Sequence, residues 1–231
     1  MLYNITVKIY YKEMLKMKAV IFDLDGTLTD TIAAITHFGN RALAEHGFGP
    51  IKSDTYKYLV GDGRTLLIHR MLAYHNADTD ENFQKVCKTY DTYYEADPMY
   101  MTDAYPGIKS VIKELKARGI KTAVCSNKPG NVVEGVIEKV FDKGDFDYVY
   151  GQTEGIPTKP DAAPALKVSE KIGVPPCECI FTGDTNVDIR TAKNAKMTSV
   201  GVLWGFRTRN ELEEAGADYI IEKPEEYLKL I

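Results

Sequence analysis

Two aspartates one residue apart, Asp23 and Asp25, are the first residues in the chain that could do chemistry. They follow the apolar run 19–22, which is long enough for a buried strand and too short for a helix. A buried carboxylate is costly unless something pairs with it, so acids at the end of such a strand need a reason. We interpret Asp23 as a nucleophile and Asp25 as an acid/base with a divalent cation between them. A polar turn is the plain alternative.

Polar groups follow other expected strands in the same way. The run 121–125 ends at Ser126 and Asn127, and the run 179–182 ends at Gly183 and Asp184. Lys159 lies in a loop bracketed by prolines, Ile-Pro-Thr-Lys-Pro, over residues 156–160. Parallel α/β sheets bind ligands at the carboxyl ends of their strands. These groups are therefore expected to meet Asp23 and Asp25 at one edge of the sheet.

The residue types suit phosphoryl transfer, which needs positioning and charge neutralisation. Asp23 is expected to attack phosphorus, and Asp25 to give a proton to the leaving oxygen and then take one from water. Carboxylates facing a phosphate need a cation, and oxygen ligands favour Mg2+. Asp184 is a further ligand, and Asp188, one helical turn later, would hold the metal's waters or orient Asp184.

Phosphate binding is expected from several small or polar groups near the two aspartates. Ser126 and nearby backbone N–H groups would bind phosphoryl oxygens, and Lys159 would add fixed positive charge to Asp23. The remaining candidates for substrate or phosphate binding are Asn127, Gly26, Thr27, Gly63 and Arg64. Gly63 and Arg64 belong to a glycine loop that would allow close approach to substrate, although a plain turn between helices is an open alternative there.

The segments that must position these residues alternate along most of the chain. From residue 105 onward, helical patterns at 107–118, 130–140, 161–172, 186–195 and 209–215 alternate with strand patterns ending near 125, 150, 182, 203 and 221. This alternation predicts an α/β fold with a Rossmann-like, doubly wound parallel sheet. Helical patterns alone occupy about 31–96, so an all-helical segment is expected to be inserted after the first strand.

Length and composition are those of a globular protein with a sizeable core. The 231 residues are 44% hydrophobic and 27% charged, and the net charge of −4 gives no reason to expect nucleic acid or an anionic membrane as a partner. The four cysteines, Cys87, Cys125, Cys177 and Cys179, are expected to be reduced thiols in a cytoplasmic protein. The N-terminus is a poor signal peptide, and residues 1–16 are expected to be an extension outside the core.

Together, these motifs resemble the haloacid dehalogenase-like hydrolase superfamily. The sequence DLDGTLTD at 23–30 is similar to its first motif, Ser126 to the start of the second, Lys159 to the third and GDTNVD at 183–188 to the fourth. The phrases SNKP (126–129) and KPDAAPAL (159–166) are most similar to the phosphoglycolate phosphatase branch. Lys196 departs from that branch, which usually has glycine there, at a helix end away from the chemistry.

This resemblance implies a function and a division of the chain. It implies hydrolysis of a small phosphorylated metabolite, with 2-phosphoglycolate favoured, through an aspartyl-phosphate. Asp23 would be the nucleophile, Asp25 the acid/base, and Mg2+ the cofactor held by Asp23, the Asp25 backbone carbonyl and Asp184. The α/β core would comprise 17–30 and 101–231, and 31–100 would form an α-helical cap. A monomer or a homodimer is expected.

Other functions on related folds stay open from the sequence. A β-phosphoglucomutase-like sugar-phosphate mutase is one, although Thr27 replaces its usual valine and Ile35 stands where its cap histidine is expected. A pyrophosphatase or nucleotidase is another, because cap loops decide the substrate. A non-catalytic, phospho-accepting regulatory module belongs to a different class, but such modules lack a cap insertion.

Several aromatic residues are expected to have structural roles only. Trp204 and Phe206 should pack behind the site instead of lining it. A tyrosine cluster should form the core of the cap and the packing at its hinge; its members are Tyr90, Tyr93, Tyr94, Tyr100 and Tyr105. The four histidines, His37, His46, His69 and His75, show no partner pattern and should be structural or exposed.

Overall fold

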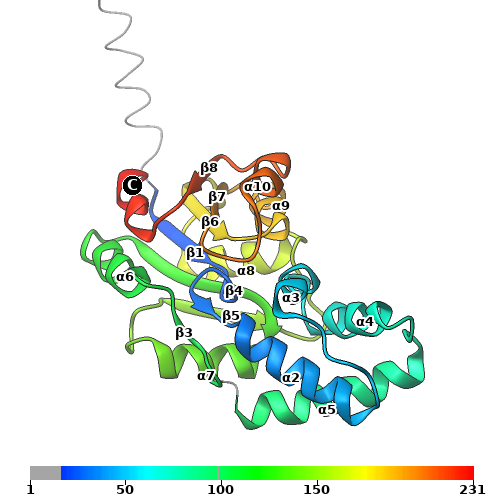
Figure 1. The fold of residues 1–231 in the computed structure, drawn as a ribbon. Helices are drawn as coiled ribbons and strands as arrows, with labels where there is room; N and C mark the ends of the chain where they lie inside the picture. The colour runs from blue at the N-terminus through cyan, green and yellow to red at the C-terminus, as the bar shows by residue number, and fades with distance from the viewer. Residues whose placement is uncertain (1–16, 98) are drawn as a thin grey trace, which may run out of the picture.

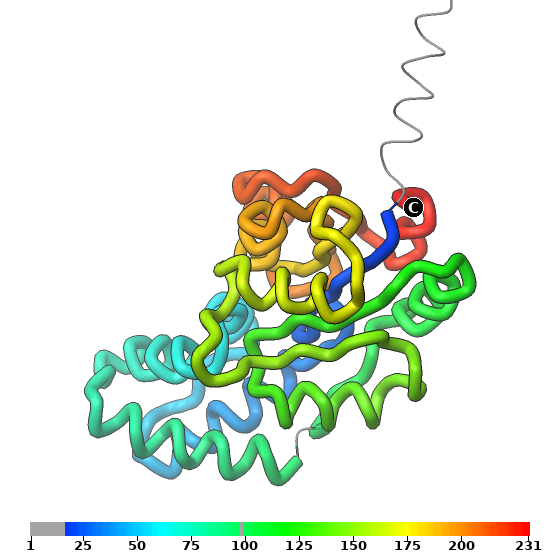
Figure 2. Tube along the Cα trace, turned by 180° about the vertical axis from the view of Figure 1, so that it is seen from behind, coloured from blue at the N-terminus to red at the C-terminus, as the bar shows by residue number. Residues whose placement is uncertain are grey.

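A computed structural model describes residues 17–97 and 99–231. The expected N-terminal extension, residues 1–16, lies outside this part of the chain. The described residues form a mostly parallel α/β core and a group of helices to one side of it (Figure 1). Figure 2 shows from behind that these helices project from one end of the core.

The core is built on a six-stranded sheet in the order β5-β4-β1-β6-β7-β8, with every neighbouring pair parallel. Its strands are β1 (Ala19–Phe22), β4 (Lys121–Pro129), β5 (Tyr148–Gln152), β6 (Cys179–Gly183), β7 (Thr198–Val202) and β8 (Tyr219–Ile221). The helices between them are α6 (Ile108–Ala117), α7 (Gly130–Val140), α8 (Ala163–Ile172), α9 (Asn186–Asn194) and α10 (Arg209–Glu214), with a short 3-10 helix, η1 (Pro176–Glu178), before β6. Another 3-10 helix, η2 (Pro224–Lys229), follows β8. This confirms the predicted doubly wound parallel sheet.

The central strand β1 is buried on both faces, which explains its continuous apolar sequence. Val20 and Phe22 pack in the cluster that contains residues of α6, α7 and η2. Ala19 and Ile21 pack in the cluster that contains residues of α8 and α9. Since successive side chains of a strand point to opposite faces, β1 packs against both layers of helices. Asp23 follows directly at its carboxyl end.

The described part of the inserted segment contains four helices: α2 (Ile32–Glu45), α3 (Ser53–Leu59), α4 (Arg64–Tyr74) and α5 (Asp80–Ala96). They share one apolar cluster, in which residues such as Phe38, Met71 and Tyr94 are buried. Val132 and Phe206 of the core also belong to this cluster. The helices therefore have a core of their own, and that core extends to the surface of the α/β part.

A small antiparallel ribbon lies where the chain enters and leaves the inserted helices. It pairs β2 (Thr29–Asp30) with β3 (Asp103–Ala104). Neither strand was expected, because two residues are too few to show a strand period. The ribbon brings the two connections to the helical segment side by side.

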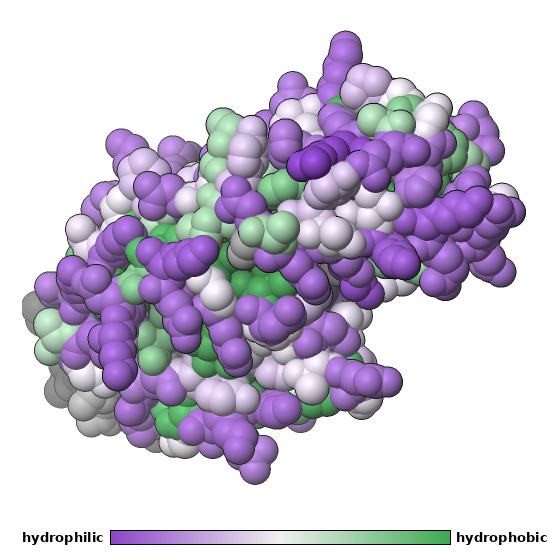
Figure 3. Space-filling model, turned by 90° about the horizontal axis from the view of Figure 1, so that it is seen from below, coloured by the Kyte–Doolittle hydropathy of each residue, from purple (hydrophilic) through white to green (hydrophobic). Residues whose placement is uncertain are grey.

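Hydrophilic residues cover most of the face in Figure 3, and apolar residues appear between them in smaller patches. None of the helices in 17–97 and 99–231 combines the length and apolar composition that a membrane span needs.

Candidate active site

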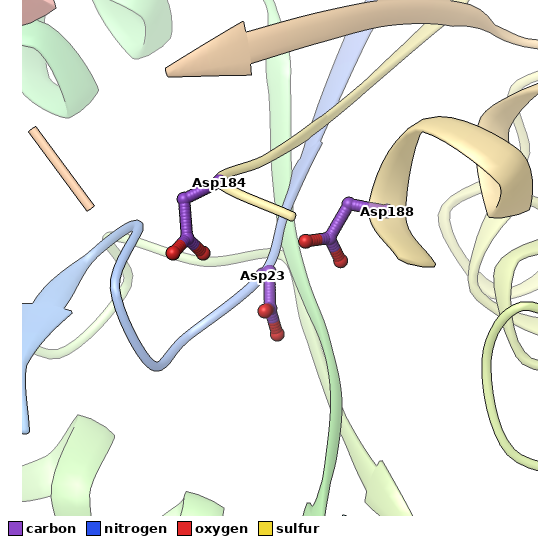
Figure 4. Close-up of side chains that lie close together, drawn as sticks. All are labelled: Asp23, Asp184 and Asp188. Carbon is purple, nitrogen blue, oxygen red and sulfur yellow. The ribbon is translucent and has the colours of Figure 1, made fainter. Parts of the chain in front are cut away.

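Three buried aspartates meet at the carboxyl end of the sheet. Asp23, Asp184 and Asp188 each place a carboxylate oxygen within 4.8 Å of the others (Figure 4). The meeting follows from register, because Phe22, the last residue of β1, is paired with Thr182 of β6, and β6 ends one residue later. Asp188 comes from the first turn of α9. We call these three residues the acidic cluster.

Hydrogen bonds from the surrounding loops orient Asp184 and Asp188. The backbone N–H of Phe206 donates to Oδ2 of Asp184 at 2.8 Å, and the Thr27 hydroxyl donates to Oδ1 at 3.1 Å. Oδ2 of Asp188 accepts from the backbone N–H and the hydroxyl of Thr185, at 3.1 and 2.8 Å. Asp188 thereby completes a capping box at the start of α9. Both carboxylates are held in place by groups outside the cluster.

Lys159 is the cation that the described structure places against the acidic cluster. Its Nζ lies 2.8 Å from Oδ1 of Asp23 and 2.7 Å from Oδ1 of Asp188, and its side chain is 1% exposed. Asn127 fixes the Lys159 loop, because its Oδ1 accepts from the Lys159 N–H at 2.8 Å and its Nδ2 donates to the Lys159 carbonyl at 3.0 Å. Asn127 therefore positions Lys159 through the backbone.

One lysine does not balance three buried carboxylates. Burial raises the pKa of Asp23 to about 7 although Lys159 opposes the shift, and burial, Asp188 and Asp23 raise the pKa of Asp184 well above its ordinary value. Charges this close, removed from water, need a counter-charge. The donor set consists of oxygens alone, which suits a hard divalent cation. The acidic cluster therefore has the composition of a divalent metal site.

A cavity between the inserted helices and the sheet opens onto this cluster. Its floor includes Asp23, Asp25, Ser126, Asn127 and Lys128. Its other wall belongs mainly to the helical segment. The side chains of this segment that line the cavity are mostly apolar or aromatic and include Ile35, Val60, Leu67, Tyr90 and Tyr94, together with the charged Arg64. None of the residues that line the cavity in the described chain is a histidine. The space beside Asp23 is therefore lined by both the core and the inserted helices.

The structure separates the Asp25 carboxylate from the acidic cluster. Oδ1 of Asp25 accepts from Nζ of Lys128 at 2.8 Å and lines the cavity. Ser126 is buried beside it, and its hydroxyl oxygen accepts from the Lys128 N–H at 3.2 Å. Asp23 and Asp25 thus point to different partners, as two carboxylates with different chemical roles would.

The glycine loop before α4 touches the core directly. Nδ2 of Asn127 donates to the Gly61 carbonyl at 3.2 Å. Gly63 has a φ of +88°, and a Cβ there would lie 3.2 Å from the Asn127 carbonyl oxygen. Arg64 lines the cavity, but its Nη1 is 2.5 Å from Oδ2 of Asp91, so its charge is already paired within the helical segment.

Some expectations for this region were wrong. Phe206 lines the cavity and supplies the N–H that holds Asp184, instead of packing behind the site. Tyr90 and Tyr94 also line the cavity, although they belong to the apolar cluster of the inserted helices as expected. Lys128 was not singled out, and the one available signal was its place two residues after Ser126 at the same strand end.

Gly26 lies in the loop after β1, where this loop packs closely on Asp184. Its φ is +83°, and an added Cβ would lie 2.7 Å from Cγ and 2.9 Å from Oδ1 of Asp184. Gly26→Ala should lower the free energy of unfolding by about 1–3 kcal/mol and weaken the binding of a divalent metal ion, measured by urea unfolding and titration calorimetry. Gly135→Ala, in α7 with nothing near its added Cβ, is the control. Unchanged metal affinity in Gly26→Ala would contradict the tight packing.

Comparison with known proteins agrees with this geometry. Phosphoglycolate phosphatase of Rhodospirillum rubrum is 32% identical over 205 residues, covering 87% of this chain and 85% of that protein. Phosphoglycolate phosphatase of Agrobacterium fabrum is 33% identical over 204 residues, covering 87% of each. A crystal structure of a phosphoglycolate phosphatase candidate from Lactobacillus delbrueckii subsp. bulgaricus superposes with a TM-score of 0.88 at 32% identity, covering 92% of this chain and 97% of that one.

A family model identifies the wider group. The model described as haloacid dehalogenase-like hydrolase matches residues 20–202, which include both aspartates of the first motif, Ser126, Lys159 and the acidic residues after β6. The match confirms the resemblance that the motifs indicated. This chain belongs to the haloacid dehalogenase-like hydrolase family.

Proposed function

We propose that this protein is a Mg2+-dependent phosphatase that hydrolyses a small phosphomonoester, with 2-phosphoglycolate favoured. One observation supports this most directly: Asp23 belongs to the acidic cluster and also lines the cavity that contains Asp25. A nucleophile, a metal site and a second carboxylate therefore share one small space. The names of the relatives point to 2-phosphoglycolate within this class.

The residues present fit Mg2+, as the oxygen donors and the excess negative charge of the acidic cluster indicate. The carboxylates of Asp23 and Asp184 and the backbone carbonyl of Asp25 would hold it, with Asp188 orienting the site through Lys159 and Thr185. When bound, Mg2+ supplies positive charge that offsets the repulsion between these carboxylates and a phosphate dianion.

The chain's own residues then account for both halves of the reaction. A carboxylate oxygen of Asp23 attacks phosphorus, the bond from phosphorus to the ester oxygen breaks, and Asp25 gives that oxygen a proton. Asp25 next takes a proton from water, whose oxygen attacks the aspartyl-phosphate and releases inorganic phosphate and free Asp23. Ser126, the backbone of Gly26 and Thr27, and the fixed charge of Lys159 would bind the phosphoryl oxygens.

The inserted helices would determine which ester enters. We propose that 31–100 acts as a cap over a core made of 17–30 and 101–231, with Gly63 and Arg64 facing the part of the substrate that leaves. Support comes from the cavity, whose wall opposite Asp23 belongs mainly to these helices. The partner would be a small phosphorylated metabolite that fits beneath them.

The test is phosphate release from a panel of phosphomonoesters that includes 2-phosphoglycolate, a sugar phosphate, pyrophosphate and a nucleotide. We expect Mg2+-dependent hydrolysis with the highest kcat/KM for 2-phosphoglycolate. Conversion of the sugar phosphate into an isomer without phosphate release would instead indicate a mutase. An enzyme that releases phosphate from none of them would refute the proposed function.

Metal removal gives a separate prediction. EDTA should abolish phosphate release, and excess Mg2+ should restore it, because Asp23 and Asp184 would otherwise repel the substrate. Beryllium fluoride should inhibit by occupying the phosphoryl position at Asp23. The readout is the initial rate before and after each addition. Full activity in the presence of excess EDTA would remove the metal from the proposal.

A further inference from the structure

Lys128 is a buried lysine that the reaction described above does not use. It lies in β4, two residues after Ser126, and its side chain is 9% exposed. Its Nζ is 2.8 Å from Oδ1 of Asp25 and 2.6 Å from the hydroxyl oxygen of Tyr94. A buried lysine is costly unless its charge is paired, so these two contacts explain why the ammonium can lie beside the cavity.

The two partners of Lys128 come from different parts of the molecule. Asp25 belongs to the loop after β1, whereas Tyr94 belongs to α5 of the inserted helices. The ammonium also lies 4.7 Å from the centre of the Tyr94 ring. Lys128 therefore joins the proposed acid/base to the proposed cap through one nitrogen atom.

Lys128 is also a hydrogen-bond partner of the Asp25 carboxylate. Among the side-chain hydrogen bonds of residues 17–97 and 99–231, the Asp25 carboxylate makes one, and its donor is Lys128. Asp23, by contrast, is held by Lys159, and Asp184 by Thr27 and Phe206. A carboxyl group that must reach a leaving oxygen within hydrogen-bond distance needs a fixed orientation.

We propose that Lys128 is a positioning residue for Asp25, and that Tyr94 holds Lys128 in place when the inserted helices pack against the core. Asp25 is then correctly aimed only when the cavity is covered. This inference rests on the proposed function, because it takes Asp25 as the group that protonates the leaving oxygen. It adds a specific link, from Tyr94 through Lys128 to Asp25, that ties covering of the substrate to proton transfer.

This role makes a prediction that depends on the leaving group. An alkyl phosphomonoester has a poor leaving oxygen that needs a proton from Asp25, whereas p-nitrophenyl phosphate has a good one that needs little help. Loss of Lys128 should therefore slow alkyl substrates selectively. A lysine that merely stabilised the fold would affect both kinds of substrate equally.

The experiment compares Lys128→Met, Lys128→Arg and Tyr94→Phe with the unaltered chain on 2-phosphoglycolate, ethyl phosphate and p-nitrophenyl phosphate. For Lys128→Met we expect kcat on both alkyl substrates to fall about 100-fold or more, the lower end of what acid–base catalysis contributes. KM should change little, and kcat on p-nitrophenyl phosphate should fall much less. Lys128→Arg should recover part of the alkyl rate, and Tyr94→Phe should show a smaller loss with the same selectivity.

Two variants serve as matched controls. Lys167→Met removes a lysine that lies over the Tyr150 ring, 5.3 Å from its centre, on α8. Tyr93→Phe removes the neighbouring hydroxyl on α5, which donates to Glu45 away from the cavity. Both should keep kcat for all three substrates close to that of the unaltered chain.

Four outcomes would overturn the inference. Equal losses on all substrates would make Lys128 structural, and a loss confined to 2-phosphoglycolate, with a raised KM, would make it a ligand for the substrate's carboxylate. If Lys128→Met does not fold, Lys128→Arg and Tyr94→Phe take its place in the comparison. Losses in these two variants that are equal for alkyl substrates and p-nitrophenyl phosphate would then make Lys128 structural. A protein that hydrolyses none of the three would refute the proposed function together with this inference.

Discussion

Replacing Asp23 with asparagine should abolish turnover while leaving the fold intact. The amide has nearly the same shape as the carboxylate, but it cannot attack phosphorus, so we expect kcat to fall on the order of 10^6-fold, as on loss of a catalytic nucleophile elsewhere. Asp23 lies at the end of β1 against Lys159, and an asparagine oxygen can still accept that lysine's hydrogen bond. The measurement is the initial rate of phosphate release with saturating Mg2+.

The same variant tests for the covalent intermediate. Acid-quenched wild-type enzyme should show one added phosphoryl group by mass spectrometry, on the peptide that contains Asp23, and Asp23→Asn should show none. Asp142→Asn is a matched control, because that aspartate is exposed and pairs with Lys113 on the surface. Turnover in Asp23→Asn close to that of Asp142→Asn would remove Asp23 from its role as nucleophile.

Replacing Lys159 with methionine should have the largest effect on stability. The side chain is 1% exposed and lies between Asp23 and Asp188. Burial alone would lower its pKa, but these carboxylates raise it, so the group stays charged. Removing one partner of a buried charge pair costs about 3–5 kcal/mol, because the remaining charge is left uncompensated. We expect Lys159→Met to lower the free energy of urea unfolding by this amount.

Two comparisons separate this charge effect from a loss of packing. Mg2+ should stabilise Lys159→Met more than the unaltered chain, and adding Asp188→Asn should make the double variant more stable than Lys159→Met alone. Lys193→Met, which breaks a half-exposed pair with Asp218, should cost less than about 1 kcal/mol. If Lys159→Met costs no more than Lys193→Met, the acidic cluster does not depend on this lysine.

The sequence determined the features that depend on local patterns of residues, namely the strands, the helices and the order in which they occur. The apolar run 19–22 could only be a buried strand, and Asp23 had to follow it at the carboxyl end. Helical periods over 31–96 made an all-helical insertion predictable, and the alternation after residue 105 made a parallel sheet predictable. Because parallel strands place their carboxyl ends at one edge, Asp184 and Ser126 could be expected near Asp23 from the sequence alone.

Contacts between segments far apart in the sequence could be found only from the tertiary structure. The pairing of Lys128 with Tyr94 depends on how the inserted helices sit on the core. The pairing of Lys128 with Asp25, and the place of Phe206 beside Asp184, depend on how loops at the ends of different strands of the sheet meet. The ribbon of β2 and β3 was also hidden, because each strand has only two residues. Periodicity reports which face of one element is apolar, but it has no information about which distant side chain meets that face, since packing of the whole chain decides that.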